Sequence, residues 1–249
     1  MGTNILLFIV VGFVAQMIDG ALGMAYGVSS NTFLLSIGIP PALASASVHL
    51  AEVFTTGVSG FSHWKFGNTD KDLIKKLLIP GVLGGITGVY LLTSIPTNII
   101  KPLVSVYLLV IGIIILSKVL YPKEGEYKSI STTRLSFLGL LGGFFDAIGG
   151  GGWGPIVTTT LVAKGKNPRY AIGSVNMTEF AVTLAESATF AIFLRVVHWE
   201  IVIGLLIGGM IAAPLGAYAT NKLPLRALTG MLGGLIVALS LRTIIMIFI

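Results

Sequence analysis

The stretch DAIGGGGWGP at residues 146–155 interrupts an otherwise apolar part of the chain. Each of its four consecutive glycines disfavours a helix by about 1 kcal/mol relative to alanine, and Pro155 has no amide hydrogen to donate. The sequence therefore predicts that a helix ends here. In a hydrocarbon environment, the backbone groups freed by such a break must be satisfied by protein or by a water-filled cavity. A break of this kind is typical of a binding site.

The composition places the rest of the chain in a membrane. The 249 residues are 54% hydrophobic and only 10% charged, and several apolar runs approach the roughly 20 residues that cross a bilayer core. We predict a single multi-pass domain, residues 1–249, in the cell membrane, with no cleaved signal peptide. The absence of cysteine excludes disulfides and cysteine-ligated metals. The net charge of +6 resides in connecting loops, so we predict no nucleic-acid binding.

A weaker copy of the break, DGALGMAYG at residues 19–27, lies 127 residues earlier. This offset superimposes residues 19–56 on 146–183 without a gap, with twelve identities in 38 positions. Apolar composition alone does not explain the identical polar and proline pairs, which include Asp19/Asp146, Pro41/Pro168 and Glu52/Glu179. We infer an internal duplication, with repeat 1 at residues 4–118, a cytoplasmic linker at 119–134 and repeat 2 at 135–249.

Each half contains five apolar pieces, of which the first two are short. At 1.5 Å per residue, pieces of about 10 to 15 residues reach only about 15–22 Å. We therefore predict an all-α polytopic membrane protein in which each half is a re-entrant broken-helix hairpin followed by three transmembrane helices. The predicted pieces are 4–18, 24–37, 42–61, 73–93 and 97–118 in the first half, and 135–145, 153–163, 169–194, 201–220 and 225–249 in the second.

Positive charge is distributed oppositely in equivalent loops. Residues 38–41 carry no charge, whereas the equivalent link contains Lys164, Lys166 and Arg169. By the positive-inside rule, we predict four cytoplasmic segments and both termini outside. Equivalent loops then face opposite sides, which predicts inverted-topology repeats, an architecture of transporters whose site lies at the repeat interface. The predicted cytoplasmic segments are residues 62–72, 119–134, 164–169 and 221–226.

Two glutamates lie near the middle of predicted spans, Glu52 and Glu179. A carboxyl there costs a few kcal/mol, which makes each a candidate functional residue. Each could carry a proton during transport, or it could pin an interrupted helix by hydrogen bonding to free backbone. His49 and Asn176 lie three residues earlier, on the same helical face.

The residues around the two breaks suit anion binding. Asp19 and Asp146 could cap the following helix or couple protons. Free amides at a helix start carry partial positive charge and attract anions, while Tyr26 and Trp153 could wall the anion or simply pack in the core. The predicted substrate-binding residues are Tyr26, Ser29, Ser30, Asn31, His49, Gly151, Gly152, Trp153, Thr158, Thr159 and Asn176.

The duplicated D-x-x-x-G-x-x-x-G break, the prolines at Pro41 and Pro168 and the S-V-x-x-x-E start of the next span resemble the sulfite exporter TauE/SafE family over essentially the whole chain. The resemblance implies an integral membrane transporter of small sulfur-containing anions such as sulfite, thiosulfate or sulfonates. The first break departs from the glycine-rich pattern, because Met24, Ala25 and Tyr26 stand where the second has glycines and a tryptophan. The two half-sites are therefore expected to differ.

We predict a secondary transporter of a sulfur oxyanion or sulfonate, in contact with membrane lipid and coupled to protons through Glu52 and Glu179. An alternative is a Na⁺ or Ca²⁺ antiporter that uses the same glutamates as oxygen ligands. An intramembrane hydrolase is disfavoured, because its only local pair, Ser47 and His49, lies two residues apart on a helix and does not share a face. No nucleotide-binding loop is present, and we predict no cofactor, no metal and no enzymatic activity.

Overall fold

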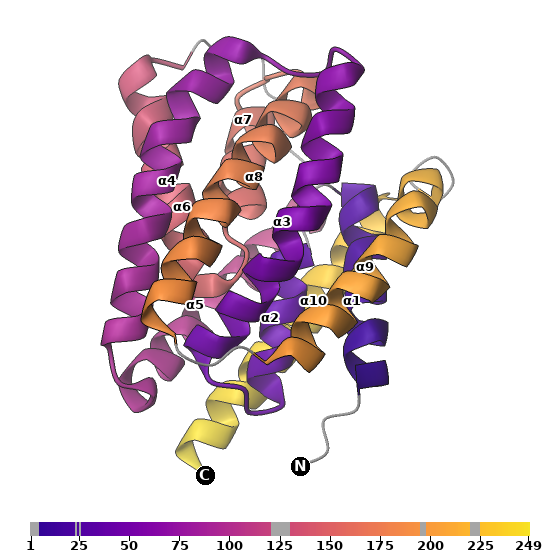
Figure 1. The fold of residues 1–249 in the computed structure, drawn as a ribbon. Helices are drawn as coiled ribbons and strands as arrows, with labels where there is room; N and C mark the ends of the chain where they lie inside the picture. Colours follow the sequence, from indigo (N-terminus) through magenta and orange to yellow (C-terminus); the bar gives the residue numbers. More distant parts are fainter. Residues whose placement is uncertain (1–4, 23, 25, 121–129, 195–197, 220–224) are drawn as a thin grey trace.

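The computed structural model describes residues 5–22, 24, 26–120, 130–194, 198–219 and 225–249, and their regular structure is helical (Figure 1). The first half contains α1 (Ile5–Leu22), α2 (Tyr26–Ser36), α3 (Pro41–Lys65), α4 (Lys71–Ser94) and α5 (Thr97–Leu120). The second half contains α6 (Thr132–Gly149), the π-helical turn η1 (Gly154–Thr158), α7 (Thr159–Ala163), α8 (Pro168–Phe193), α9 (Trp199–Ala219) and α10 (Leu225–Phe248). The all-α prediction is confirmed.

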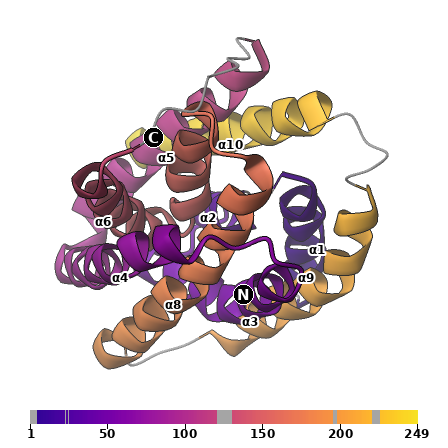
Figure 2. The same ribbon diagram turned by 90° about the horizontal axis from the view of Figure 1, so that it is seen from above.

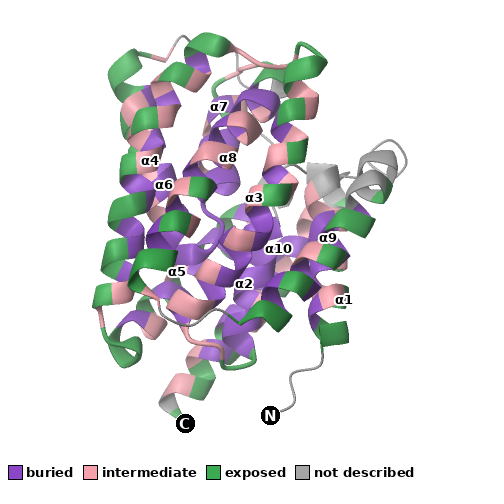
Figure 3. Cartoon of the chain, viewed as in Figure 1, coloured by how far each residue is buried: buried purple, intermediate pink, exposed green. Residues whose placement is uncertain are grey.

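Within the described residues, three helices are long and apolar enough to cross a membrane: α4, residues 97–117 of α5 and residues 229–247 of α10. Helix α4 has one face that packs in the bundle and one exposed apolar face. An exposed apolar stripe runs along one side at Ile79, Leu83, Ile86 and Tyr90, at the spacing of one helical face. Figure 3 shows the buried residues concentrated in the middle of the bundle and the exposed ones on its outer faces and ends. This is the arrangement of a membrane protein whose outer surface faces lipid.

The helices pack in pairs that combine the two halves. Helix α1 packs on α9, and α6 packs on α4, while α3 pairs with α8 and α5 with α10. Figure 2 shows α1 and α9 on one side of the bundle, α4 and α6 on the opposite side, and α2 within it. In the repeat, α1 corresponds to α6, α4 to α9, α3 to α8 and α5 to α10. Exchanging the two halves therefore converts the α1–α9 pair into the α6–α4 pair and leaves the α3–α8 and α5–α10 pairs unchanged.

Small residues allow the closest helix contacts. A Cβ at Gly84 of α4 would lie 2.1 Å from the carbonyl oxygen of Leu140 on α6, and one at Gly208 of α9 would lie 2.0 Å from that of Ile9 on α1. In membrane helices, such small residues let backbones approach and gain packing energy. The α4–α6 and α1–α9 pairs are therefore built in the same way.

The two arms of each predicted hairpin differ in length. Helices α1 and α6 each contain 18 residues, which is about 27 Å, so the prediction of a short first arm was wrong. Helix α6 starts earlier than predicted because Ser131 accepts a hydrogen bond from the amide of Arg134, and it continues through Gly149. The second arms are short, as predicted: α2 has 11 residues, and η1 and α7 have five each. Figure 1 shows α2 toward the end where both termini lie and α7 toward the opposite end.

The connection between α3 and α4 is tied to the connection between α7 and α8. Asp70 caps α4 through its Oδ1, and its Oδ2 lies 2.6 Å from Nζ of Lys166. The Asp70 amide donates to Oγ of Ser174 on α8. These contacts bring residues 62–72 and 164–169 to one end of the bundle, although their cytoplasmic location stays a prediction. The other two segments predicted to be cytoplasmic fall largely outside the described residues.

The Asp70–Lys166 contact predicts an acid-sensitive contribution to stability. Burial raises the pKa of the Asp70 carboxyl, but the hydrogen bonds from Lys166, Leu73 and Asp72 together bring it below its usual value. A carboxyl with a lowered pKa stabilises the fold above the unfolded-state pKa of about 3.9 and loses this effect as the pH falls through the folded-state pKa. Asp70→Asn keeps a capping acceptor but removes the charge. We expect a small drop in melting temperature at pH 7 that disappears as the pH falls below about 4.

The matched control is Asp72→Asn, because Asp72 pairs with Lys76 inside α4 and its side chain is 73% exposed. This substitution should leave the melting temperature unchanged both at pH 7 and below about pH 4. Equal melting of wild type and Asp70→Asn at neutral pH would show that the contact between the two connections does not stabilise the fold.

Candidate functional site

The second break is closed by the side chain of Asp146 at the end of α6. Its Oδ1 accepts the amide hydrogens of Gly152 at 2.6 Å and of Trp153 at 2.9 Å. The chain reverses through Gly150 and Gly151, whose φ angles are +64° and +150°, a region that residues with a Cβ rarely adopt. The first break has the same device, because Asp19 Oδ1 accepts the amide of Tyr26 at 3.2 Å. The predicted capping by both aspartates is confirmed, and a role for them in proton coupling stays a prediction.

The two breaks contact each other backbone to backbone. A Cβ on Gly27 would lie 2.4 Å from the carbonyl oxygen of Gly150, and one on Gly151 would lie 2.1 Å from the amide nitrogen of Val28. Asn31 of α2 crosses the same contact and donates from Nδ2 to the carbonyl of Gly149 at 2.5 Å. The glycines are therefore required by the approach of the two halves as well as by the turn.

The capping aspartates occupy amides that were predicted to bind the substrate. The amide of Tyr26 donates to Asp19, and those of Gly152 and Trp153 donate to Asp146. The prediction that these amides are free is wrong for this conformation, because an aspartate oxygen already accepts each of them. Any anion bound here must find other donors or displace a carboxylate.

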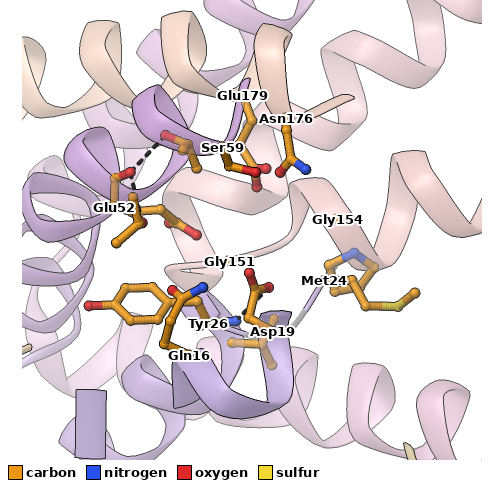
Figure 4. A pocket seen from close by; sticks show the side chains of 15 residues that line it. Gln16, Asp19, Met24, Tyr26, Glu52, Ser59, Gly151, Gly154, Asn176 and Glu179 are labelled. Atoms are coloured by element: carbon orange, nitrogen blue, oxygen red, sulfur yellow. Dashed lines mark hydrogen bonds between the residues drawn. The ribbon is translucent and has the colours of Figure 1, made fainter. Parts of the chain in front are cut away.

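A polar pocket lies between the two halves, beside the contact of the breaks (Figure 4). Its free volume is about 30 Å³, enough for a water molecule or two. Six residues of the predicted site line it: Asp19, Tyr26, Glu52, Gly151, Asn176 and Glu179. Figure 4 shows Glu52 and Ser59 of α3 across from Glu179 and Asn176 of α8, with Asp19 and Gln16 of α1 below them. Both repeats thus contribute side chains to one pocket.

The pocket is lined by acids and neutral polar groups. Its three carboxyls are Asp19, Glu52 and Glu179, and no described lysine, arginine or histidine is among its lining residues. The Tyr26 hydroxyl donates to the carbonyl of Leu205 and is therefore not available to a ligand. Four further residues that the sequence analysis did not select carry hydrogen-bonding side chains at the pocket: Gln16, Thr55, Thr56 and Ser59.

Trp153 and the predicted hydroxyl residues do not line the pocket. Trp153 is fully buried and donates from Nε1 to the carbonyl of Val175 on α8, so its packing role prevails in this conformation. The hydroxyl of Ser29 donates to the carbonyl of Tyr26, and that of Thr159 donates to the carbonyl of Pro155.

Ser30 and Thr158 are buried, and their hydroxyls have no hydrogen-bond partner among the described residues. Their assignment to the substrate site stays a prediction. The same holds for Asn31, which the structure places at the contact between the breaks.

His49 belongs to a second, fully buried cluster. Its Nε2 lies 2.7 Å from Oε2 of Glu186 on α8 and 3.6 Å from Oδ2 of Asp146 on α6, with no exposure of any of the three side chains. Its Nδ1 lies 2.7 Å from the carbonyl of Ser45. The Ser47–His49 pair considered for a hydrolase does not form, because the Ser47 hydroxyl donates to the carbonyl of Leu43.

Glu186 was missed because the sequence comparison relied on identities between the two halves. The offset of 127 residues pairs Glu186 with Ser59, so neither residue stood out. A usable signal was present, since Glu186 lies seven residues after Glu179 and therefore on the same face of α8. Likewise, Ser59 lies seven residues after Glu52 on α3.

The contact between the breaks predicts that a methyl group at Gly151 strongly destabilises the fold. Gly151→Ala requires both a disfavoured φ and displacement of the Gly27–Val28 backbone, so we expect a loss of about 2 kcal/mol or more. The control is Gly234→Ala in α10, where a Cβ meets nothing within 4 Å. Thermal melting of the purified variants in detergent compares them. Equal melting of Gly151→Ala and Gly234→Ala would contradict the backbone contact.

Comparisons with known proteins agree with this architecture. The sequence profile described as Sulfite exporter TauE/SafE matches residues 8–243. The chain is 44% identical over 249 residues to a protein of Bacillus subtilis (strain 168) named "Probable membrane transporter protein YtnM", an alignment that covers 97% of this chain and 83% of that protein. No solved structure matches the chain significantly. The chain is a membrane protein that belongs to the sulfite exporter TauE/SafE family.

Proposed function

We propose that the protein is a secondary transporter that moves a small sulfur-containing anion, such as sulfite, thiosulfate or an organosulfonate, across the cell membrane by alternating access. The observation that carries the proposal is the pocket beside the contact of the two breaks, which is lined by α1, α2 and α3 of the first half and by η1 and α8 of the second. Membership of the family supports a small anion as the substrate. A site shared by two repeats can open to either side when one repeat moves against the other.

The two halves are proposed to be inverted-topology repeats, with the substrate held between them. Two features support this arrangement: the helix pairs map onto each other when the halves are exchanged, and the short arms α2 and α7 lie toward opposite ends of the bundle (Figure 1). The distribution of Lys and Arg supports an orientation with both termini outside.

The acids of the pocket set a condition on anion binding. Two like charges about 5 Å apart repel by about 3 kcal/mol at an effective dielectric constant of about 20. The anion is therefore proposed to enter when Glu52 and Glu179 are protonated, and to be held by neutral donors of Gln16, Ser59 and Asn176. Transport of the anion is then coupled to protons through the same pocket.

A cation antiporter is the second candidate, and the carboxyl-lined pocket favours it. Asp19, Glu52 and Glu179, together with the oxygens of Thr55 and Ser59, are the hard ligands that Na⁺ and Ca²⁺ prefer. In that case the carboxyls would be ionised when the substrate binds. The two candidates thus require opposite protonation states of one pocket.

The direct test is binding by purified protein, followed by uptake into proteoliposomes, with sulfite, thiosulfate and sulfate against Na⁺ and Ca²⁺. We expect binding of a sulfur oxyanion and a roughly tenfold loss of affinity, about 1.4 kcal/mol, in Asn176→Ala. The control is Asn98→Ala, which removes an exposed asparagine at the start of α5 and should leave the affinity unchanged. Binding of Ca²⁺ or Na⁺ without any anion would favour the antiporter instead.

The protonation condition gives a separate prediction. In the wild type, anion affinity should rise as the pH falls, because protons neutralise the pocket. Glu179→Gln keeps the shape of the side chain without its charge, so affinity should become less dependent on pH while remaining measurable at neutral pH. Isothermal titration at several pH values measures this. A pH dependence identical to that of the wild type would mean that Glu179 does not control anion entry.

A further inference from the structure

The two halves treat equivalent positions differently. One set of three residues lines the pocket: Asp19, Ser59 and Asn176. The residues that the offset of 127 pairs with them are also brought together, but in a closed cluster that does not line the pocket: Asp146, Glu186 and His49. Equivalent positions of the two repeats thus form one group of polar residues that lines a pocket and one group of ionisable residues that is packed without a pocket.

We propose that His49, Asp146 and Glu186 form a proton-binding site, separate from the substrate pocket, in which one exchangeable proton is shared between Nε2 of His49 and the carboxyl group of Glu186. The site takes a single proton from solvent and returns it. Its role as the coupling site for transport rests on the proposed function, whereas proton binding itself does not.

The hydrogen bonds around the cluster determine where this proton can lie. The carbonyl of Ser45 lies 2.7 Å from Nδ1 of His49 and accepts from it, and the Ser45 hydroxyl donates to the carbonyl of Ala147. Nε2 is therefore the ring atom that faces the carboxylates. Oδ1 of Asp146 already accepts two amide hydrogens, and its Oδ2 lies 3.6 Å from Nε2, farther than the 2.7 Å that separates Nε2 from Oε2 of Glu186. The exchangeable proton is left to His49 and Glu186.

The short contact favours a proton over a metal ion. Nε2 and Oε2 are 2.7 Å apart, the separation of a charge-assisted hydrogen bond, although the N–H direction is off the line between them. Two ligands of a tetrahedral metal bound at about 2.0–2.1 Å lie about 3.3 Å apart. The close pair leaves no space for an ion between its atoms.

The surroundings make the proton necessary. No described lysine or arginine lies within ion-pair distance of the cluster, and α4 approaches it at Gly85, where a Cβ would lie 2.4 Å from Oε1 of Glu186. The other titratable groups that interact electrostatically with it are Glu52 of α3, Tyr107 of α5 and Glu179 of α8. None of these supplies a positive charge.

Loss of the proton would therefore leave two ionised carboxylates beside a neutral imidazole in a dry interior, at a cost of several kcal/mol. Separation of α8 from α6, or entry of water, relieves this cost. Proton release at this cluster is thereby linked to movement of α8 relative to α6 within the second half, or to hydration of the cluster.

The equivalent positions of the other repeat suggest the variant to test. His49→Asn combined with Glu186→Ser converts the cluster to the residues of its repeat mate, Asn176 and Ser59. Potentiometric titration of purified protein without substrate counts the protons exchanged. We expect the wild type to exchange about one proton per chain more than the double variant across the pH range in which both stay folded. Glu186→Gln, which preserves the shape of the side chain, should show the same deficit and replaces the double variant if that variant melts too low.

An equal proton count in wild type and Glu186→Gln would overturn the proposal, as would one equivalent of metal found in purified wild-type protein by elemental analysis. Asp72→Asn is the control for the loss of a distant carboxyl. In proteoliposomes that take up sulfite, a pH-sensitive dye should report about one proton fewer moved per sulfite in Glu186→Gln than in wild type, because the protons carried by Glu52 and Glu179 are retained. If the wild type does not bind sulfite, the proposed function fails while the proton count still decides this site.

Discussion

The backbone contact between the two interrupted helices is the constraint on which the rest of the structure depends. Gly27 and Val28 of one break lie against Gly150 and Gly151 of the other, at distances that exclude any side chain. The contact requires helices that stop inside the bundle, and stopped helices require an acceptor for their freed amides. Asp19 and Asp146 are that acceptor in both halves. The duplicated aspartate and glycine thus have a structural reason before any role in transport.

Two aspartates lie at the centre, Asp146 fully buried and Asp19 partly buried, and the surrounding helices accommodate these carboxyls in two different ways. Around Asp19, α3 contributes Glu52 and Ser59, α8 contributes Asn176 and Glu179, and free volume remains for a ligand or water. Around Asp146, His49 and Glu186 close the space and bring a titratable pair into contact. With no described Lys or Arg ion-paired to Asp146, Glu186 or the two pocket glutamates, the balance must come from protons or other cations. This is why we assign a separate proton-binding site to the closed cluster, and substrate binding together with the protons of Glu52 and Glu179 to the open pocket.

The sequence predicted the helices and the breaks well, because apolar length, glycine and proline are strong local signals. It also predicted the capping role of Asp19 and Asp146, which follows from their position before a helix start. The sequence did not show that Asp146 accepts hydrogen bonds from both the Gly152 and the Trp153 amides, because its carboxyl reaches them only once the turn has formed. Glu186 was not predicted because no repeated motif marks it. Only tertiary packing brings it next to His49. Differences between the halves carry as much functional information as their identities.

The most direct test of a substrate site at the meeting of the two breaks is an experimental structure of the protein with bound thiosulfate, whose outer sulfur scatters strongly. The account predicts density for the anion in the pocket between α3 and α8, within hydrogen-bond distance of Asn176 or Ser59 and beside Glu179. Density for the anion at a position away from both breaks, with the pocket holding only water, would contradict it.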